Sequence, residues 1–183
     1  RRVNELHSHV KGEYPAKDGK AAPYSARDAR HLLWVHCAFT DSFLRAQIEL
    51  GYPIALGADR YVQEWAKSAV PLGLNNAPQS ALELQEAIAG FVVNEVEAIA
   101  MTPPIVKFIL KPPFSKGGLF FYRILANAAI ATIDEPFLTV LGLKKRSKIW
   151  LRVSRKLLDF LSYMLGHESP SQKIARARIE ALQ

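Results

Sequence analysis

The sequence predicts an all-α protein, a single domain over residues 1–183 arranged as a multi-helix orthogonal bundle of about eight helices. Apolar residues recur at intervals of three and four in one segment after another, and glycine and proline separate these segments. The alternating pattern of a half-buried strand is absent. With 49% apolar and 22% charged residues, the 183-residue chain has the composition of a globular domain.

The first predicted helix covers residues 1–11 and ends at Gly12, where a polar loop over residues 13–24 begins. No cap residue precedes this helical pattern, so we expect further residues upstream of Arg1 in the intact protein. Ser25, with Asp28 three residues later, resembles a capping box and predicts the start of a long central helix that ends at Gly51.

A shorter helix is predicted over residues 57–70, and the capping box Ser80-Ala81-Leu82-Glu83 predicts another that closes before Pro103. Proline and glycine pairs then delimit the remaining helices. We expect these over residues 103–110, 119–133, 134–142, 147–165 and 171–182. The markedly apolar helix over 119–133 is interpreted either as a central core helix or as the wall of a cavity or membrane-facing surface.

Composition excludes several classes of protein. Cys37 is the single cysteine, so neither an internal disulfide nor a cysteine-based zinc site can form, which indicates a reducing compartment. No stretch reaches the roughly 18 uninterrupted apolar residues of a membrane span. We therefore expect a cytoplasmic protein, and the distribution of charge leaves membrane association open.

The net charge of +7 is concentrated at the C-terminal end, where residues 144–183 hold ten Lys/Arg and three Asp/Glu. The basic run Lys144 to Lys156 is interpreted first as the solvated face of an amphipathic helix, whose stripe of recurring positions is Ile149, Val153, Lys156/Leu157, Phe160 and Met164. Peripheral membrane contact is an alternative, favoured by Trp150 beside the cations. No nucleic-acid-binding motif accompanies the charge, so a nucleic-acid partner is not expected.

Local motifs for chemistry are few. His31 and His36 are five residues apart, whereas two metal ligands on one helix face need a spacing of four. Cys37 lies within an apolar helix, where a buried and unreactive thiol is expected. There is no glycine-rich phosphate loop and no nucleophile elbow.

Several ordered segments resemble one known family. The segments are Arg1-Arg2-Val3-x-x-x-His7, Tyr24-Ser25-Ala26-x-Asp28, Trp34-Val35-His36 followed by Asp41-Ser42-Phe43-Leu44, and Asp59-Arg60-Tyr61-x-x-Glu64. In order and spacing the chain resembles the rubber-oxygenase catalytic-domain family, which includes latex-clearing proteins and the endoplasmic-reticulum-bound oxygenase of mycophenolate biosynthesis. The resemblance extends over nearly the whole chain.

The resemblance implies an all-helical haem b protein that uses dioxygen to cleave carbon–carbon double bonds in isoprenoid chains. It implies that His7 is the proximal ligand of the haem iron, against the alternative of an ordinary, partly exposed helical histidine. His36 is a weaker candidate for a contact at the haem edge, the alternative being a buried histidine bonded to a neighbouring helix. The distal catalytic residues of the family precede the proximal histidine, so we expect them upstream of this chain.

Two classes of function remain open at this level. The first is a haem-dependent oxygenase acting on a hydrophobic, isoprenoid-like small molecule held among apolar helices. The alternative is a non-catalytic helical module that binds a lipid or docks on a membrane surface through its basic C-terminal helices. An interaction domain without any ligand is a third reading.

Overall fold

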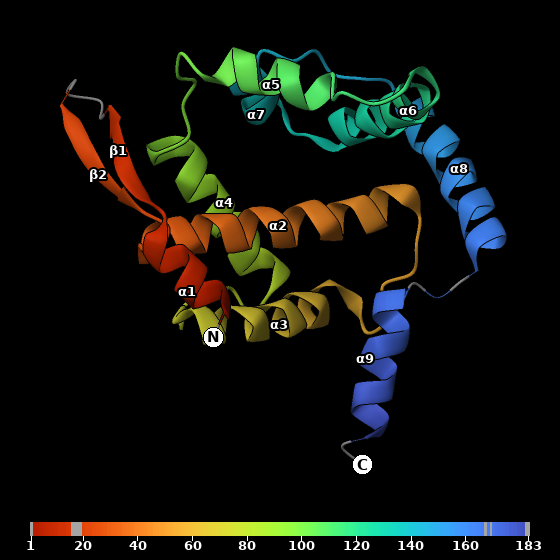
Figure 1. Cartoon of the computed structure of the whole chain (residues 1–183), viewed down its shortest axis with the longest axis horizontal. Helices are drawn as coiled ribbons and strands as arrows, with labels where there is room; N and C mark the ends of the chain where they lie inside the picture. Colours follow the sequence, from red (N-terminus) through yellow and green to blue (C-terminus); the bar gives the residue numbers. More distant parts are fainter. Residues whose placement is uncertain (1, 16–19, 167, 169, 182–183) are drawn as a thin grey trace.

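The computed structural model describes residues 2–15, 20–166, 168 and 170–181, and these confirm the all-α class. They form nine helices, a single turn of 3-10 helix and one two-stranded sheet. Arg1, at the start of the first resembling segment, and residues 16–19 of the predicted loop lie outside the described residues. Figure 1 shows the long helix α2 crossing the middle of the molecule between two groups of helices.

A β-hairpin replaces most of the loop predicted over residues 13–24. Helix α1 (Arg2–His9) is followed by β1 (Lys11–Pro15) and β2 (Ala21–Ser25), which pair antiparallel with Gly12 opposite Tyr24. The hairpin projects from the helices (Figure 1) and most of its side chains are exposed, so no buried face imposes an alternating pattern. Glycine and proline within these two segments also argued against predicting strands there.

Helix α2 (Ala29–Leu50) is the predicted central helix, although its cap is Asp28 rather than Ser25. The Asp28 carboxylate accepts hydrogen bonds from the backbone N–H groups of Arg30 and His31, at 2.8 and 3.1 Å. At the other end Gly51 adopts φ 72°, the left-handed conformation that terminates helices. Both ends of α2 are therefore encoded locally.

Helices α3 (Gly57–Ala69) and α4 (Ala81–Asn94) pack against α2 and enclose the main hydrophobic core. A 3-10 turn (Val70–Leu72) follows α3, and Ser80 caps α4 by accepting a hydrogen bond from the Glu83 N–H at 3.1 Å. The largest fully buried apolar side chains of this core are Val62, Leu84 and Phe91.

The second group contains α5 (Thr102–Leu110), α6 (Lys116–Thr132), α7 (Glu135–Leu141) and α8 (Ile149–Leu165), and α9 (Pro170–Glu180) follows. Helices α5, α6 and α7 form a layer on the side of α2 opposite α3, and α8 descends along one end of α2 (Figure 1). A smaller core of Ala128, Ala131 and Leu151 joins α6 to α8.

The predicted orientation of α8 is wrong. Most of its expected buried face is exposed, with 48% of Ile149 and 62% of Met164 accessible to solvent, although Leu157 is half-buried. Leu151 and Ser154 are buried instead. The reason is that α6 and α2 contact α8 along the Leu151–Ser154 side, which carries fewer large apolar residues. Within the described residues no helix is both long enough and apolar enough to cross a bilayer.

Candidate functional site

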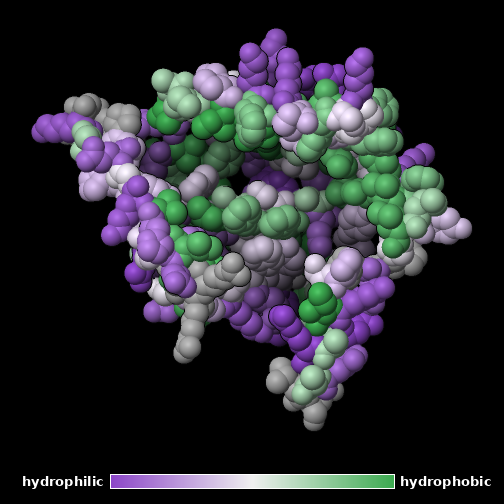
Figure 2. Space-filling model, viewed as in Figure 1, coloured by the Kyte–Doolittle hydropathy of each residue, from purple (hydrophilic) through white to green (hydrophobic). Residues whose placement is uncertain are grey.

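A cavity of about 570 Å³ lies between α2 and the helices α6, α7 and α8. Figure 2 shows the surface hollowed beside α2, between this helix and the opposite layer. The volume falls within the range of small-molecule binding sites. Apolar side chains make up most of the walls, among them Trp34, Leu50, Ile88, Val96, Leu125, Ile133, Phe137, Val140, Leu141 and Leu158.

Small side chains create this space. Ala38 and Ala46 lie on the α2 wall, and Ala128 and Ala129 lie on the α6 wall. An alanine on each of two facing helices leaves room that leucine or phenylalanine would occupy, because helix packing otherwise fills interhelical space to the density of an organic crystal. The predicted 119–133 helix therefore does line a cavity.

One ionic cluster interrupts the apolar lining. Arg45 Nη1 lies 2.9 Å from Asp134 Oδ1, and Arg45 Nη2 lies 3.3 Å from Asp41 Oδ1. Asp41 and Arg45 are four residues apart on α2, whereas Asp134 precedes α7. Burial acts to lower the pKa of Arg45, but the charges and hydrogen bonds of Asp41 and Asp134 outweigh it and raise the pKa above its ordinary value. The guanidinium group thus stays charged at the cavity wall.

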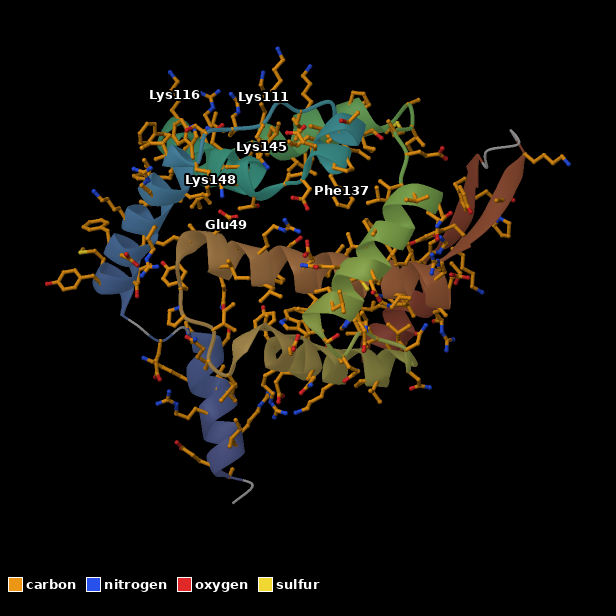
Figure 3. All side chains as sticks on the ribbon, turned by 180° about the vertical axis from the view of Figure 1, so that it is seen from behind. Glu49, Lys111, Lys116, Phe137, Lys145 and Lys148 are labelled. Atoms are coloured by element: carbon orange, nitrogen blue, oxygen red, sulfur yellow. The ribbon has the colours of Figure 1, made fainter. Side chains whose placement is uncertain are left out.

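Two hydroxyl groups of the lining donate hydrogen bonds to backbone carbonyl groups. Ser154 Oγ donates to the Ile124 carbonyl at 3.3 Å, and Thr132 Oγ1 donates to the Ala129 carbonyl at 2.8 Å. Aromatic rings close another part of the wall: the Trp34 ring lies 6.3 Å from that of Phe137, which projects from α7 toward the space above α2 (Figure 3). The cavity thus offers an apolar body with one charged cluster, which suits a hydrophobic ligand with at most one polar end.

The two histidines singled out in the sequence lie outside the cavity lining. His7 is half-buried on α1, and His36 is buried on α2 on a side different from that of Ala38 and Asp41. No described contact joins the two rings. His9, two residues after His7, is exposed.

His36 has an unusual environment. Burial lowers its pKa below the ordinary 6.5, so the ring is neutral at pH 7. Within the described part of the chain its Nε2 atom is buried and lacks a hydrogen-bond partner. The expected hydrogen bond from this ring to a neighbouring helix is therefore not found, although the His36 carbonyl does accept one from Thr40 Oγ1 at 2.8 Å.

Two other residues considered in the sequence, His31 and Asp59, contact neighbouring elements of the fold. His31 lies between the rings of Tyr14 and Tyr24, at centroid distances of 6.5 and 5.1 Å. Asp59 accepts a hydrogen bond from the Ala81 N–H at 2.8 Å and so links α3 to α4. Over residues 2–15, 20–166, 168 and 170–181, no group of three or more His, Cys, Asp or Glu side chains could hold a metal ion.

Residues 1–163 match the family model described as ER-bound oxygenase mpaB/B'/Rubber oxygenase, catalytic domain. The chain belongs to this oxygenase family. No curated protein and no solved structure matches it. Trp34, Asp41 and Ser42, three residues of the segment on α2 that carries the resemblance, line the cavity.

A haem group, which the resemblance seen in the sequence implies, requires an axial donor that the cavity walls do not supply. Its lining residues among those described include no histidine, cysteine, methionine or tyrosine. Imidazoles of suitable chemistry lie outside it: His7, partly accessible on α1, and His36, whose buried Nε2 lacks a hydrogen-bond partner, as does the buried Nδ1 of His31. The described residues thus offer histidine donors for a haem iron, and none of these histidines belongs to the cavity lining.

Proposed function

We propose that this protein is a haem b-dependent oxygenase that acts on a hydrophobic, isoprenoid-like substrate. The observation that carries the proposal is the apolar cavity whose wall contains Trp34, Asp41 and Ser42, in a chain that belongs to an oxygenase family. The family description names a rubber oxygenase and an ER-bound oxygenase. Rubber is an apolar polymer, and an ER-bound protein lies at a membrane. An alkene chain needs a volume lined by few polar groups, and these walls supply it.

His7 is proposed to hold the haem iron through its neutral imidazole. His7 lies on helix α1 and is half-buried, so its side chain is partly accessible to a ligand. Bound haem would supply the activation of dioxygen that no side chain can supply. His36 is proposed to stand at the haem edge, where its buried Nε2 would gain the polar contact that it lacks.

The chain's own residues would bind and orient the substrate. The alanine-lined space between α2 and α6 accepts the apolar chain, and the rings of Trp34 and Phe137 restrict its lateral movement. The charged cluster of Arg45 with Asp41 and Asp134 marks the polar limit of the cavity. An apolar chain is repelled from this cluster because burying it there would desolvate three charges.

The test is the visible absorbance spectrum of the full-length protein produced with a haem precursor. We expect a Soret band that is lost or shifted in His7→Ala and unchanged in His9→Ala, the matched control two residues away on the same segment. Added imidazole should restore the band in His7→Gly by occupying the vacated position. A wild-type protein without a Soret band, or a His7→Ala protein with an unaltered one, would reject His7 as the ligand.

Substrate class is tested separately by oxygen consumption with squalene, an unsaturated isoprenoid. Uptake of oxygen that requires squalene supports the oxygenase proposal, and haem-loaded protein that consumes none contradicts it. A protein that takes up no haem but binds lipid vesicles would instead favour the non-catalytic, membrane-docking helical module.

A further inference from the structure

Residues 98–133 contain no aspartate or glutamate, but they contain Lys107, Lys111, Lys116 and Arg123. This segment comprises α5, the connection after it and α6. Among the described residues, no carboxylate pairs with Lys107, Lys111 or Lys116. The local charge is therefore positive and uncompensated.

Large apolar side chains are exposed in the same segment. On α5, Ile105, Phe108 and Ile109 share one helix face, and 69% of Phe108 is accessible to solvent. Phe114 follows in the connection, and Phe120 and Phe121 are exposed on the first turns of α6, with 63% of Phe120 accessible. Helix α5 has no buried residue, so these side chains do not serve a core.

The segment is held together by its own contacts. Tyr122 Oη on α6 donates a hydrogen bond of 2.6 Å to the Ile109 carbonyl at the end of α5. The Tyr122 ring meets the Phe114 ring edge-on, with centroids 5.5 Å apart. These contacts fix α5 against α6, so lysines and phenylalanines are presented from a defined surface.

Figure 3 shows Lys111 and Lys116 projecting outward from the edge of the molecule that α5 and α6 form, on the side away from α2. In Figure 2 hydrophilic and hydrophobic side chains alternate along this edge. We call residues 105–121 of this edge the α5–α6 surface. Phenylalanine beside lysine, without acidic residues, is the composition of segments that lie in the headgroup region of a bilayer.

We propose that the α5–α6 surface docks the protein onto bilayers that contain anionic phospholipid. The lysines would meet the headgroup phosphates, and Phe108, Phe114 and Phe120 would enter the boundary with the acyl chains. Charge complementarity favours an anionic bilayer as the partner, since an uncharged apolar partner would leave the lysines without an opposite charge.

The basic run Lys144 to Lys156 fits this role less well than the sequence indicated. Lys145 donates to the Ile133 carbonyl, Lys148 lies 3.1 Å from Glu49 Oε2 at the end of α2 (Figure 3), and Arg155 lies 2.9 Å from Asp159 Oδ2. Three cations of the run are thus occupied within the protein. The lysines of the α5–α6 surface have no such partner among the described residues.

The experiment measures flotation of the full chain with vesicles of phosphatidylcholine, with and without 30% phosphatidylserine. We expect binding only to the anionic vesicles, weakened by raised salt. Lys111→Glu combined with Lys116→Glu should weaken it by about 25-fold or more, at ~5-fold for each charge. Phe108→Ser should weaken it by about ten-fold at unchanged charge.

The controls place the same changes on α8. Arg152→Glu with Lys156→Glu matches the charge reversal, and Phe160→Ser matches the loss of an exposed phenylalanine. Both should bind as the wild type does. Equal loss in these controls would place docking on α8 and overturn the proposal, as would equal binding to neutral vesicles, or binding to nucleic acid in preference to vesicles.

A second measurement reports insertion directly. An environment-sensitive fluorophore on Phe120→Cys should shift to the blue with anionic vesicles, whereas the same fluorophore on Tyr163→Cys of α8 should not. Native Cys37 is fully buried and does not compete for the label. An unshifted label at position 120 on vesicle-bound protein would also overturn the proposal. None of these readouts depends on haem, so they test membrane docking independently of the proposed oxygenase function.

Discussion

Arg45 on α2 and Asp134 before α7 lie 89 positions apart in the sequence, yet their side chains meet at 2.9 Å on the wall of the apolar cavity. The pair joins the two layers that enclose this cavity. Asp41 completes the cluster from the preceding turn of α2. The cluster therefore links the two sides of the cavity and forms part of its wall.

Removing Arg45 is expected to destabilise the protein. Arg45→Met leaves Asp41 and Asp134 without their shared cation, and we expect the free energy of unfolding to fall by about 1–2 kcal/mol. Urea denaturation measures this. A double-mutant cycle with Asp134→Asn should give a coupling energy of ~0.5–1 kcal/mol because both groups are partly solvated.

Arg60→Met provides the control for that experiment. Arg60 pairs with Glu64 on the exposed surface of α3, so its loss should change stability by less than about 0.5 kcal/mol. If the two arginine variants are equally stable, the cavity cluster has no special role in holding the layers together.

Filling the cavity should abolish binding of apolar ligands without unfolding the protein. Ala129→Phe places an aromatic ring into the space between α6 and α2, and we expect at least a ten-fold weaker affinity for an apolar fluorescent probe. Ala89→Phe, on an exposed position of α4, adds the same ring elsewhere and should leave the affinity unchanged. Fluorescence titration measures the affinity of each variant for the probe, and thermal denaturation shows whether each variant remains folded.

His36 should make stability depend on pH. Its pKa is lowered in the folded state, so the unfolded chain binds a proton more readily. The associated stability is fully present above the ordinary pKa of 6.5 and is lost as the pH falls through the lower folded-state value. Comparing urea denaturation at pH 7.5 and 5.5, we expect this decrease to be smaller in His36→Gln than in the wild type. His9→Gln, on an exposed position, should retain the full decrease.

The Cys37 thiol should be inert in the folded protein. Burial raises its pKa to about 11, and the side chain is inaccessible to solvent. A thiol-specific chromogenic reagent at pH 8 should therefore react only after denaturant is added. Rapid reaction of the native protein would show that the α2–α4 core opens on the timescale of the assay.

The sequence predicted the elements whose signals are local. Gly51 and Ser80 mark helix ends through their own backbone or side-chain chemistry, and the structure confirms both. The hairpin escaped prediction because its exposed strands carry no burial pattern. The buried side of α8 escaped it because contact with α6, and not the number of large apolar residues, decides which face is covered.

The candidate site was predictable only in part. The resembling segment placed Trp34 and Asp41 on one helix, and both line the cavity. The i, i+4 spacing of Asp41 and Arg45 is a signal that could have paired them. Nothing in the sequence connects either residue to Asp134, since this pairing arises from the tertiary packing of α7 over α2.

The hairpin has a consequence for His7. The Val10 N–H donates to the His7 carbonyl at 3.3 Å, and the Ala26 N–H donates to the Val10 carbonyl at 3.0 Å, just before Asp28 opens α2. The end of α1 is thereby tied to the start of α2 across the base of the two strands. The place of α1, and with it of His7, relative to the central helix is thus coupled to the pairing of two exposed strands.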